Sequence, residues 1–421
     1  MLTPSRIFAA YWLALIAAAL IFYPGSLLSW GTIRLILLMV GAFTLGVLIA
    51  GHGGSGGKTP AKTGPSVDTS KRRLLVGMVR LGVLCNVLAA VLALRSHGFA
   101  VTQVLSLPGL LSTANSVTVA RYSGAGGSLF VPPLLGIGYA AALVSPTLRF
   151  YGAGWLTVLA PVLSSLAFAA VTTERLGLLI SAALTAGSLI SNSVVATGSA
   201  PRLSKRIVAG ALVAGLTLGA AFTSVAFIRV GRIDPQIADV IYQKQKVYAL
   251  GSLPAFSEWL ERNNATPVQG VRPGWGTSTL AGVEYVTGRS REATRAYDEF
   301  EMIDSQGSRS NVYTVFRGLI MDFGVAGAIL LLALAGFVFG RVFRRVQITR
   351  SLPWAAVLAC FYAVILLTNT MAITSFTNVI GAMVLGVATL AWRSPGRARE
   401  NGTQRLGSPP PPRTKRRRLL T

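Results

Sequence analysis

The sequence has few of the residues that metal centres, disulfide networks and nucleophilic active sites require. Two cysteines and two histidines occur in 421 residues. Cys85 and Cys360 both lie inside apolar segments, so the sequence indicates neither a disulfide framework nor a metal site. His52 and His97 are far apart and are expected on opposite membrane faces. A Ser-His-Asp triad or a zinc site, which needs histidine beside its partner residues, is therefore not indicated.

Charge is also scarce, because 13% of the residues are charged and 52% are hydrophobic. The apolar residues form blocks of the ~20 residues that a helix needs to cross a ~30 Å hydrocarbon core. The blocks are continuous rather than alternating, which favours helices over a β-barrel. We therefore expect an all-α polytopic membrane protein with about ten transmembrane helices, at roughly 7–23, 32–50, 74–95, 128–147, 152–171, 176–195, 207–228, 314–340, 354–372 and 375–393.

Most of the basic residues that produce the net charge of +25 fall on one predicted face of the membrane. Alternate loops, Arg6, Arg149 and the C-terminal tail together hold 23 of the 39 Lys and Arg residues, against Asp68 and Glu400 alone. The positive-inside rule places this face and both termini in the cytoplasm. The basic tail after the Pro409–Pro412 spacer is interpreted as a disordered, topology-fixing end near anionic lipid, with no nucleic-acid partner.

These spans divide the chain into four parts. The first span, Phe8–Tyr23, lacks a small-residue cleavage site and is interpreted as an uncleaved anchor. Gly51–Thr59 resembles a phosphate-binding loop, but no strand precedes it, so a flexible cytoplasmic linker is favoured. The predicted parts are helices 1–7 over 1–228, a large extracytoplasmic loop over 229–313, helices 8–10 over 314–393, and the tail over 394–421.

The outer loop 229–313 is polar and balanced, with ten Lys/Arg and ten of the fourteen acidic residues of the chain. Apolar residues at near-helical spacing over 237–250 predict a short amphipathic interfacial helix. Aromatic residues are scattered through the remainder, among charged ones. Such a mixture suits sugar rings, whose C–H faces stack on aromatic rings, and it equally suits a headgroup belt.

Charged residues also occur at the outer ends of the predicted spans. Glu174 and Arg175 lie in a turn so short that two spans must meet as a tight hairpin, and Arg121 shortly precedes the fourth span. Arg317 and Asp322 lie in the first two turns of the eighth span. Ionisable groups at membrane depth usually face a cavity and mark a substrate path. The alternatives are arginines that only reach for lipid headgroups, and a structural ion pair at Asp322 made with one of the arginines.

The order of these landmarks resembles the Wzy-type oligosaccharide repeat-unit polymerases of bacterial O-antigen and exopolysaccharide pathways. The resemblance covers about 165–340 and extends to the rest by topology only. Its motifs are Thr173-Glu-Arg175-Leu-Gly177, Pro254-Ala-Phe-Ser-Glu-Trp-Leu260, a turn near Gly276 and Thr279, and Asn311-Val-Tyr-Thr314 running to Asp322-Phe-Gly324.

The resemblance implies metal-independent, inverting glycosyl transfer without a cofactor, in a fold akin to the GT-C membrane glycosyltransferases of the bacterial inner membrane. The growing glycan, linked to undecaprenyl pyrophosphate, would be transferred onto a new lipid-linked repeat unit. An associated chain-length regulator is expected from the resemblance alone.

Arginines suit this chemistry, because guanidinium groups bind phosphate oxygens in a bidentate fork and stabilise the departing charge. We expect Arg175 and Arg317 to bind the pyrophosphate and Asp322 to orient one of them, with Glu174 and Glu258 as candidate bases. The remaining candidates for substrate binding are Arg121, Trp259, Trp275, Arg309, Asn311 and Tyr313.

Two other classes remain open on the sequence. A lipid-linked glycan ligase resembles this layout, but its resemblance includes an essential histidine in the large outer loop, and 229–313 contains none. A polysaccharide transporter or flippase usually shows internal repeats with broken helices, and no convincing repeat relates the two halves.

Overall fold

The fold is that of a computed structural model of the chain. It describes residues 2–52, 69–122, 128–202, 204–231, 235–263, 276–279, 281, 300–311, 314–370 and 372–392. The protein is an α-helical, polytopic membrane protein, as the sequence predicts.

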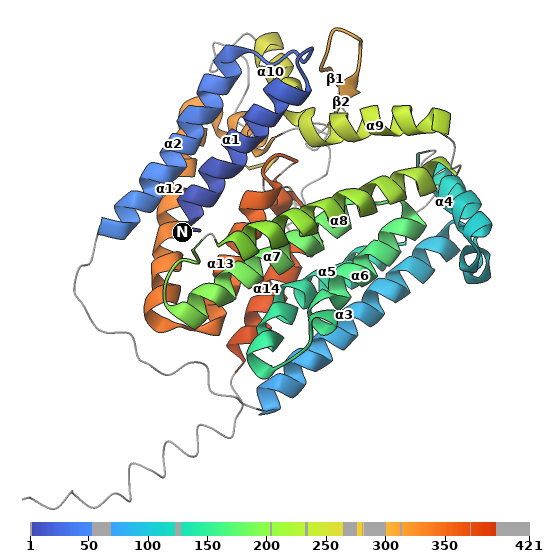
Figure 1. The fold of residues 1–421 in the computed structure, drawn as a ribbon, viewed down its shortest axis with the longest axis horizontal. Coiled ribbons are helices and arrows are strands. Elements are labelled where there is room, and N and C mark those ends of the chain that lie inside the picture. Colours follow the sequence, from blue (N-terminus) through green and yellow to red (C-terminus); the bar gives the residue numbers. More distant parts are fainter. Residues whose placement is uncertain are drawn as a thin grey trace, which may run out of the picture.

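The described residues form thirteen α-helices, three 3-10 helices and one two-stranded hairpin (Figure 1). The α-helices are α1 (Pro4–Phe22), α2 (Trp30–His52), α3 (Thr69–Ser96), α4 (Leu107–Tyr122), α5 (Val131–Val144), α6 (Trp155–Thr172), α7 (Leu176–Thr197), α8 (Lys205–Val230), α9 (Pro235–Leu250), α10 (Ser252–Arg262), α12 (Val315–Thr349), α13 (Leu352–Leu367) and α14 (Thr377–Ala391). The shorter elements are η1 (Val101–Leu105), η2 (Ser145–Tyr151), η4 (Ile373–Ser375), β1 (Glu301–Met302) and β2 (Arg309–Ser310).

Eight helical segments in the described part are long and apolar enough to cross a membrane, one of them α5 continued by η2. They match the first eight predicted spans. The ninth and tenth predicted spans correspond to α13 and α14, which are apolar but have 16 and 15 residues.

Close helix packing in the bundle depends on small residues, and the α2–α12 pair shows this most clearly. A Cβ atom at Gly46 would overlap the Ala333 carbonyl oxygen, and one at Gly336 would overlap the Phe43 carbonyl oxygen. Glycine therefore lets the two backbones approach, which is the usual way that helices associate in lipid.

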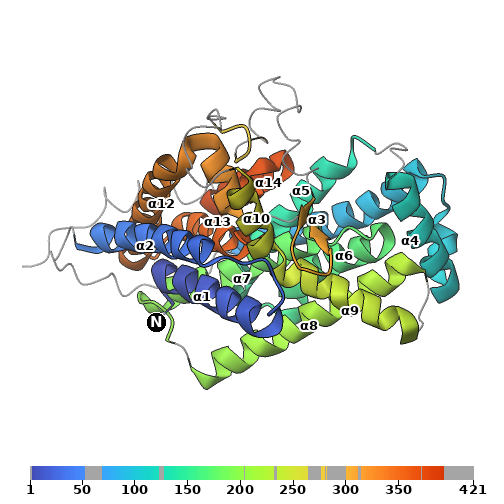
Figure 2. The same ribbon diagram turned by 90° about the horizontal axis from the view of Figure 1, so that it is seen from above.

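The described parts of the predicted outer segment, 229–313, include a layer at one end of the bundle. α9, α10 and the β1–β2 hairpin lie together there (Figures 1 and 2). The helix predicted over 237–250 is confirmed as α9, with Ile241 buried and Val240 and Tyr242 exposed. Gly251 separates α9 from α10, whose buried residues include Phe256 and Trp259.

Two features of the helices were not predicted from the sequence. No helix was predicted between the third and fourth spans, but this region contains η1 and the 16-residue α4, whose Ser, Thr and Asn residues obscure its helical pattern. The eighth span, predicted over about 314–340, is present as α12, which extends to Thr349 and is kinked at Gly324, with φ 68° and ψ 175°. This backbone conformation is accessible almost only to glycine.

Candidate functional site

Arg317 is fixed in the first turn of α12 by its neighbours. The Val315 amide donates to the Thr368 carbonyl at 2.7 Å. The Phe316 ring packs on Trp12 of α1, with ring centroids 4.6 Å apart. Arg317 is 2% exposed, and its guanidinium carbon lies 5.3 Å from the centre of the Trp259 ring of α10.

Arg175 immediately precedes α7 in the tight turn after α6, and it is 9% exposed. Its guanidinium carbon lies 4.8 Å from the centre of the Phe222 ring of α8 and 4.4 Å from that of Tyr248 of α9. Contacts of this kind contribute about 0.5–2 kcal/mol each. The adjacent Glu174 is exposed. The hairpin predicted at this turn is therefore present, and it is covered by α8 and α9.

The turn that carries Arg175 also contacts α4. Thr173 adopts a left-handed conformation with φ 59°, and its hydroxyl is hydrogen-bonded to that of Thr118 at 2.7 Å. Arg121 follows Thr118 by about one helical turn. The end of α4 that bears Arg121 is thus placed beside the Arg175 turn, although the Arg121 side chain itself lies outside the described part of the structure.

The two buried arginines are linked through the outer layer. Tyr248, over Arg175, is in α9, and Trp259, over Arg317, is in α10. The two helices are consecutive, joined at Gly251, and lie above the bundle in Figure 1. Trp259 packs against Phe256 of the same helix, with the two rings stacked and their centroids 6.2 Å apart. One helix pair therefore presents an aromatic ring to each arginine.

Asp322 is completely buried and accepts hydrogen bonds from the outer segment. Its carboxylate accepts from the Ser278 amide at 2.9 Å, the Thr279 amide at 2.7 Å, the Thr279 hydroxyl at 2.6 Å and the Thr277 hydroxyl at 3.4 Å. The described contacts of Asp322 are thus with this turn rather than with an arginine, and the ion pair expected from the sequence stays a prediction because the Arg121 side chain lies outside the described residues. Asp322 instead anchors the turn 276–279.

The same turn is held from a third direction by η4. The Ser375 hydroxyl donates to the Ser278 carbonyl at 2.8 Å, and the Thr374 hydroxyl donates to the Thr279 carbonyl at 2.5 Å. The sequence indicates a turn at this position through Gly276 and Thr279 alone. What the sequence did not reveal is that it inserts between α12 and η4.

Glu258 precedes Trp259 in α10 and is half-buried. Burial raises the pKa of its carboxyl, repulsion from Glu261 raises it further, and Arg262 opposes both. Arg262 also forms an ion pair with the buried Glu301 of β1. A carboxylate with a raised pKa next to an aromatic ring is suited to accept a proton from a sugar hydroxyl.

The β1–β2 hairpin is tied to the turn after α1. The Tyr23 hydroxyl donates to the Asp304 carboxylate, which also accepts from the Gln306 and Ser308 amides at 2.9 Å each. The Leu27 amide donates to the Ile303 carbonyl at 2.9 Å. The local sequence gives no signal for the contact between Tyr23 and Asp304, because the two residues are 281 positions apart.

The remaining candidates are placed less centrally or fall outside the described part. Arg309 is an exposed residue of β2, paired with Met302, and Asn311 follows the hairpin, half-buried. Trp275 and Tyr313 lie outside the described residues. No group of three or more His, Cys, Asp or Glu side chains that could hold a metal ion occurs in the part of the chain that the structure describes.

The chain was compared with known families, proteins and structures. No protein-family model, no curated protein and no solved structure matches it.

Proposed function

We propose that the protein is a membrane glycosyltransferase that polymerises undecaprenyl-pyrophosphate-linked oligosaccharide repeat units. The observation that supports this most is the pair of buried arginines at the starts of α7 and α12, each against an aromatic ring of the α9–α10 pair. Guanidinium groups suit a diphosphate, and aromatic rings suit the sugars attached to it. A site with both elements fits a substrate that carries both.

Each residue has a role in this proposal. Arg175 and Arg317 bind the diphosphate of the growing chain, and Arg121 is a third donor. The acceptor hydroxyl of the incoming repeat unit attacks the anomeric carbon, the bond to the diphosphate breaks with inversion, and the diphosphate leaves with the electron pair. Glu258 takes the hydroxyl proton, since its raised pKa brings it nearer the working pH of a general base.

The other residues position these groups. Trp259 stacks on a sugar ring beside Glu258, and Asp322 holds the turn 276–279 against the start of α12. Arg309, Asn311, Trp275 and Tyr313 line the path of the glycan. The site faces the extracytoplasmic side of the bacterial inner membrane, because the positive-inside rule places the basic loops in the cytoplasm.

The decisive variant is Arg175→Ala. We expect the long-chain ladder on a glycan gel to disappear while single lipid-linked repeats persist, because loss of a phosphate donor of this type costs roughly 10²–10³ in rate. Arg149→Ala is a matched control, since Arg149 also lies over an aromatic ring, 4.8 Å from the centre of Trp155, outside the proposed site. A normal ladder from a well-expressed Arg175→Ala protein would contradict the role of Arg175 in binding the diphosphate.

Purified protein separates the remaining classes. We expect it to lengthen lipid-linked repeat units without any energy source. A transporter would leave their length unchanged, and a ligase would move glycan only to a different acceptor. Either result in place of elongation contradicts the proposal.

A further inference from the structure

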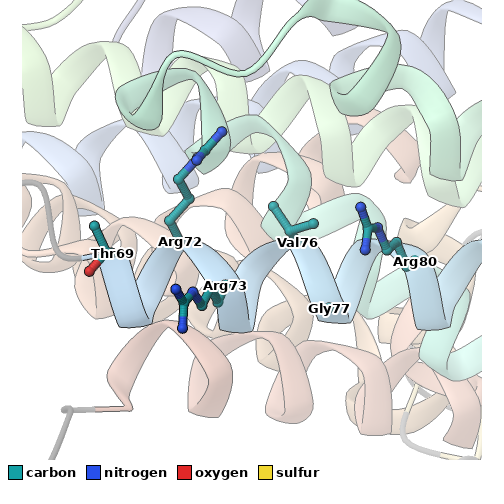
Figure 3. Close-up of a pocket in the computed structure, with 6 residues that line it drawn as sticks. All are labelled: Thr69, Arg72, Arg73, Val76, Gly77 and Arg80. Carbon is teal, nitrogen blue, oxygen red and sulfur yellow. The ribbon is translucent and has the colours of Figure 1, made fainter.

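The N-terminal end of α3 carries a basic cavity that the proposed glycan site does not use. It has a volume of about 480 Å³. The described residues that line it are Thr69, Arg72, Arg73, Val76, Gly77 and Arg80 (Figure 3). Arg72, Val76 and Arg80 are spaced by one helical turn each and project to the same side of α3 in the close-up.

This face of the helix is held outward by packing on the opposite face. Leu75 and Met78 are buried in the bundle on the far side of the helix from Arg80, whereas the three arginines are exposed. The Lys71 ammonium donates to the Leu390 carbonyl at 2.8 Å, which fixes the first turn of α3 to the end of α14. No Asp or Glu occurs in α3, so the helix itself supplies no counter-charge to its arginines.

The same face continues as an apolar surface. Leu84 is 54% exposed and Val87 is 48% exposed, one and two turns beyond Arg80. Arg80 itself lies roughly 12 Å along the helix from Arg72. Three guanidinium groups are thus followed by a strip of exposed aliphatic side chains on a helix long enough to span the membrane.

We propose that this cavity binds the phosphate headgroup of an anionic phospholipid, whose acyl chain follows the strip at Leu84 and Val87. The guanidinium groups match a phosphate diester in charge and hydrogen-bonding geometry. A nucleic acid has no apolar part to cover the aliphatic strip, and a soluble acidic protein would not reach a strip that lies along a membrane-spanning helix. The combination of cavity, arginines and apolar surface therefore selects a lipid.

The test measures retained phospholipid by native mass spectrometry of the full-length protein, reconstituted with phosphatidylglycerol in phosphatidylcholine and then extracted in mild detergent. An arginine at an anionic surface strengthens binding about fivefold, so Arg80→Ala should weaken phosphatidylglycerol retention by about that factor, and replacement of all three arginines far more. Arg95→Ala is the matched control, because Arg95 is an exposed arginine at the other end of the same helix.

A second variant tests the cavity without removing charge. A Cβ at Gly77 would meet no atom within 4 Å, so Gly77→Leu fills the cavity without disturbing the fold and should also reduce retention. Equal retention by the arginine variants and Arg95→Ala, or full retention by Gly77→Leu, would overturn the proposal. Displacement of the lipid by millimolar inorganic phosphate would also overturn it, because the site would then bind a soluble anion. Should the triple variant misfold, Arg80→Ala and Gly77→Leu decide.

Discussion

The carboxylate of Asp322 joins two parts of the chain that are 43–45 residues apart. Two of its four donors are the backbone amides of Ser278 and Thr279, whose hydrogen bonds to the carboxylate are buried. An unpaired buried amide costs about 1–3 kcal/mol. Asp322 therefore acts as a structural anchor, and in the proposed function it affects the glycan only through this turn and through Arg317 on the same helix.

Replacing Asp322 by Asn should release this turn. The amide group of Asn offers one acceptor oxygen and turns a donor toward donors, so the Ser278 or Thr279 amide loses its partner. We expect a loss of about 1–3 kcal/mol in the free energy of unfolding. In hydrogen-exchange mass spectrometry, the peptide that contains residues 277–279 should exchange faster.

Asp239→Asn is the control for this change, because Asp239 is an exposed acid of α9. Its exchange profile and melting temperature should match those of the unmodified protein. Unchanged exchange at 277–279 in Asp322→Asn would contradict the anchoring role.

At the scale of elements, the kink in α12 separates its site-bearing first turns from its membrane span. The segment after Gly324, residues 325–349, is roughly 37 Å long at 1.5 Å per residue, which is sufficient to cross the hydrocarbon core without the segment before the kink. Arg317 and Asp322 therefore need not lie in lipid. The kink instead directs 315–323 toward α10 and the turn 276–279.

Gly324→Ala should disturb this arrangement through the backbone alone. Nothing lies within 4 Å of a Cβ at Gly324, but its φ of 68° and ψ of 175° strain any other residue by about 1–3 kcal/mol. We expect lower thermal stability and reduced glycan elongation together. Gly381→Ala in α14 is the matched control, since its Cβ also meets nothing and its helical backbone tolerates alanine. Equal behaviour of the two variants would contradict a role for the kink.

The hairpin gives a prediction about pH. Burial acts to raise the pKa of Asp304, but hydrogen bonds from Ser308, Tyr23 and Gln306 outweigh it, so the pKa lies below its usual value. The unfolded carboxyl titrates near pH ~3.9. The stabilisation is therefore complete above that pH and is lost as the pH falls through the folded pKa.

Melting temperatures measured against pH will test this. The difference between the unmodified protein and Asp304→Asn should be constant near neutral pH and shrink below about pH 4. Tyr23→Phe removes one donor, so the folded pKa of Asp304 lies closer to its unfolded value, and the acid-induced loss of stability should be smaller and end at a higher pH than in the unmodified protein. A difference that persists unchanged in acid would show that Asp304 does not stabilise the hairpin through its charge.

Regular elements were far easier to predict than contacts between them. The long apolar helices follow from continuous hydrophobic runs, and α9 follows from its periodicity. α4 was missed because Leu107–Tyr122 is too polar to resemble a span. Arg175 and Arg317 were singled out from their positions at helix starts. Their aromatic partners, and the donors to Asp322, depend on how distant segments return to the bundle, which the local sequence does not encode.

At the scale of the whole molecule, the basic segments at the ends of α2, α7 and α12 lie close together at one end of the bundle. The Arg344 guanidinium donates to the Gly51 carbonyl at 3.2 Å, linking the end of α2 to the end of α12. Arg350 lies against Gly198 after α7, and the Leu2 amide donates to the Pro201 carbonyl at 2.8 Å. These segments were assigned to one membrane face from charge alone, and their mutual contacts agree with that grouping.

The same arrangement predicts which end faces the cytoplasm. Ser305 lies in the hairpin turn and Ser199 in the turn after α7, at opposite ends of the bundle, and both are exposed. Because the positive-inside rule places the basic end in the cytoplasm, a membrane-impermeant maleimide should label Ser305→Cys in intact cells and label Ser199→Cys only after permeabilisation. Cys85 and Cys360 are buried, which keeps the background low. The reverse labelling pattern would place the arginine site on the cytoplasmic side, where a polymerase acting on exported repeat units has no substrate.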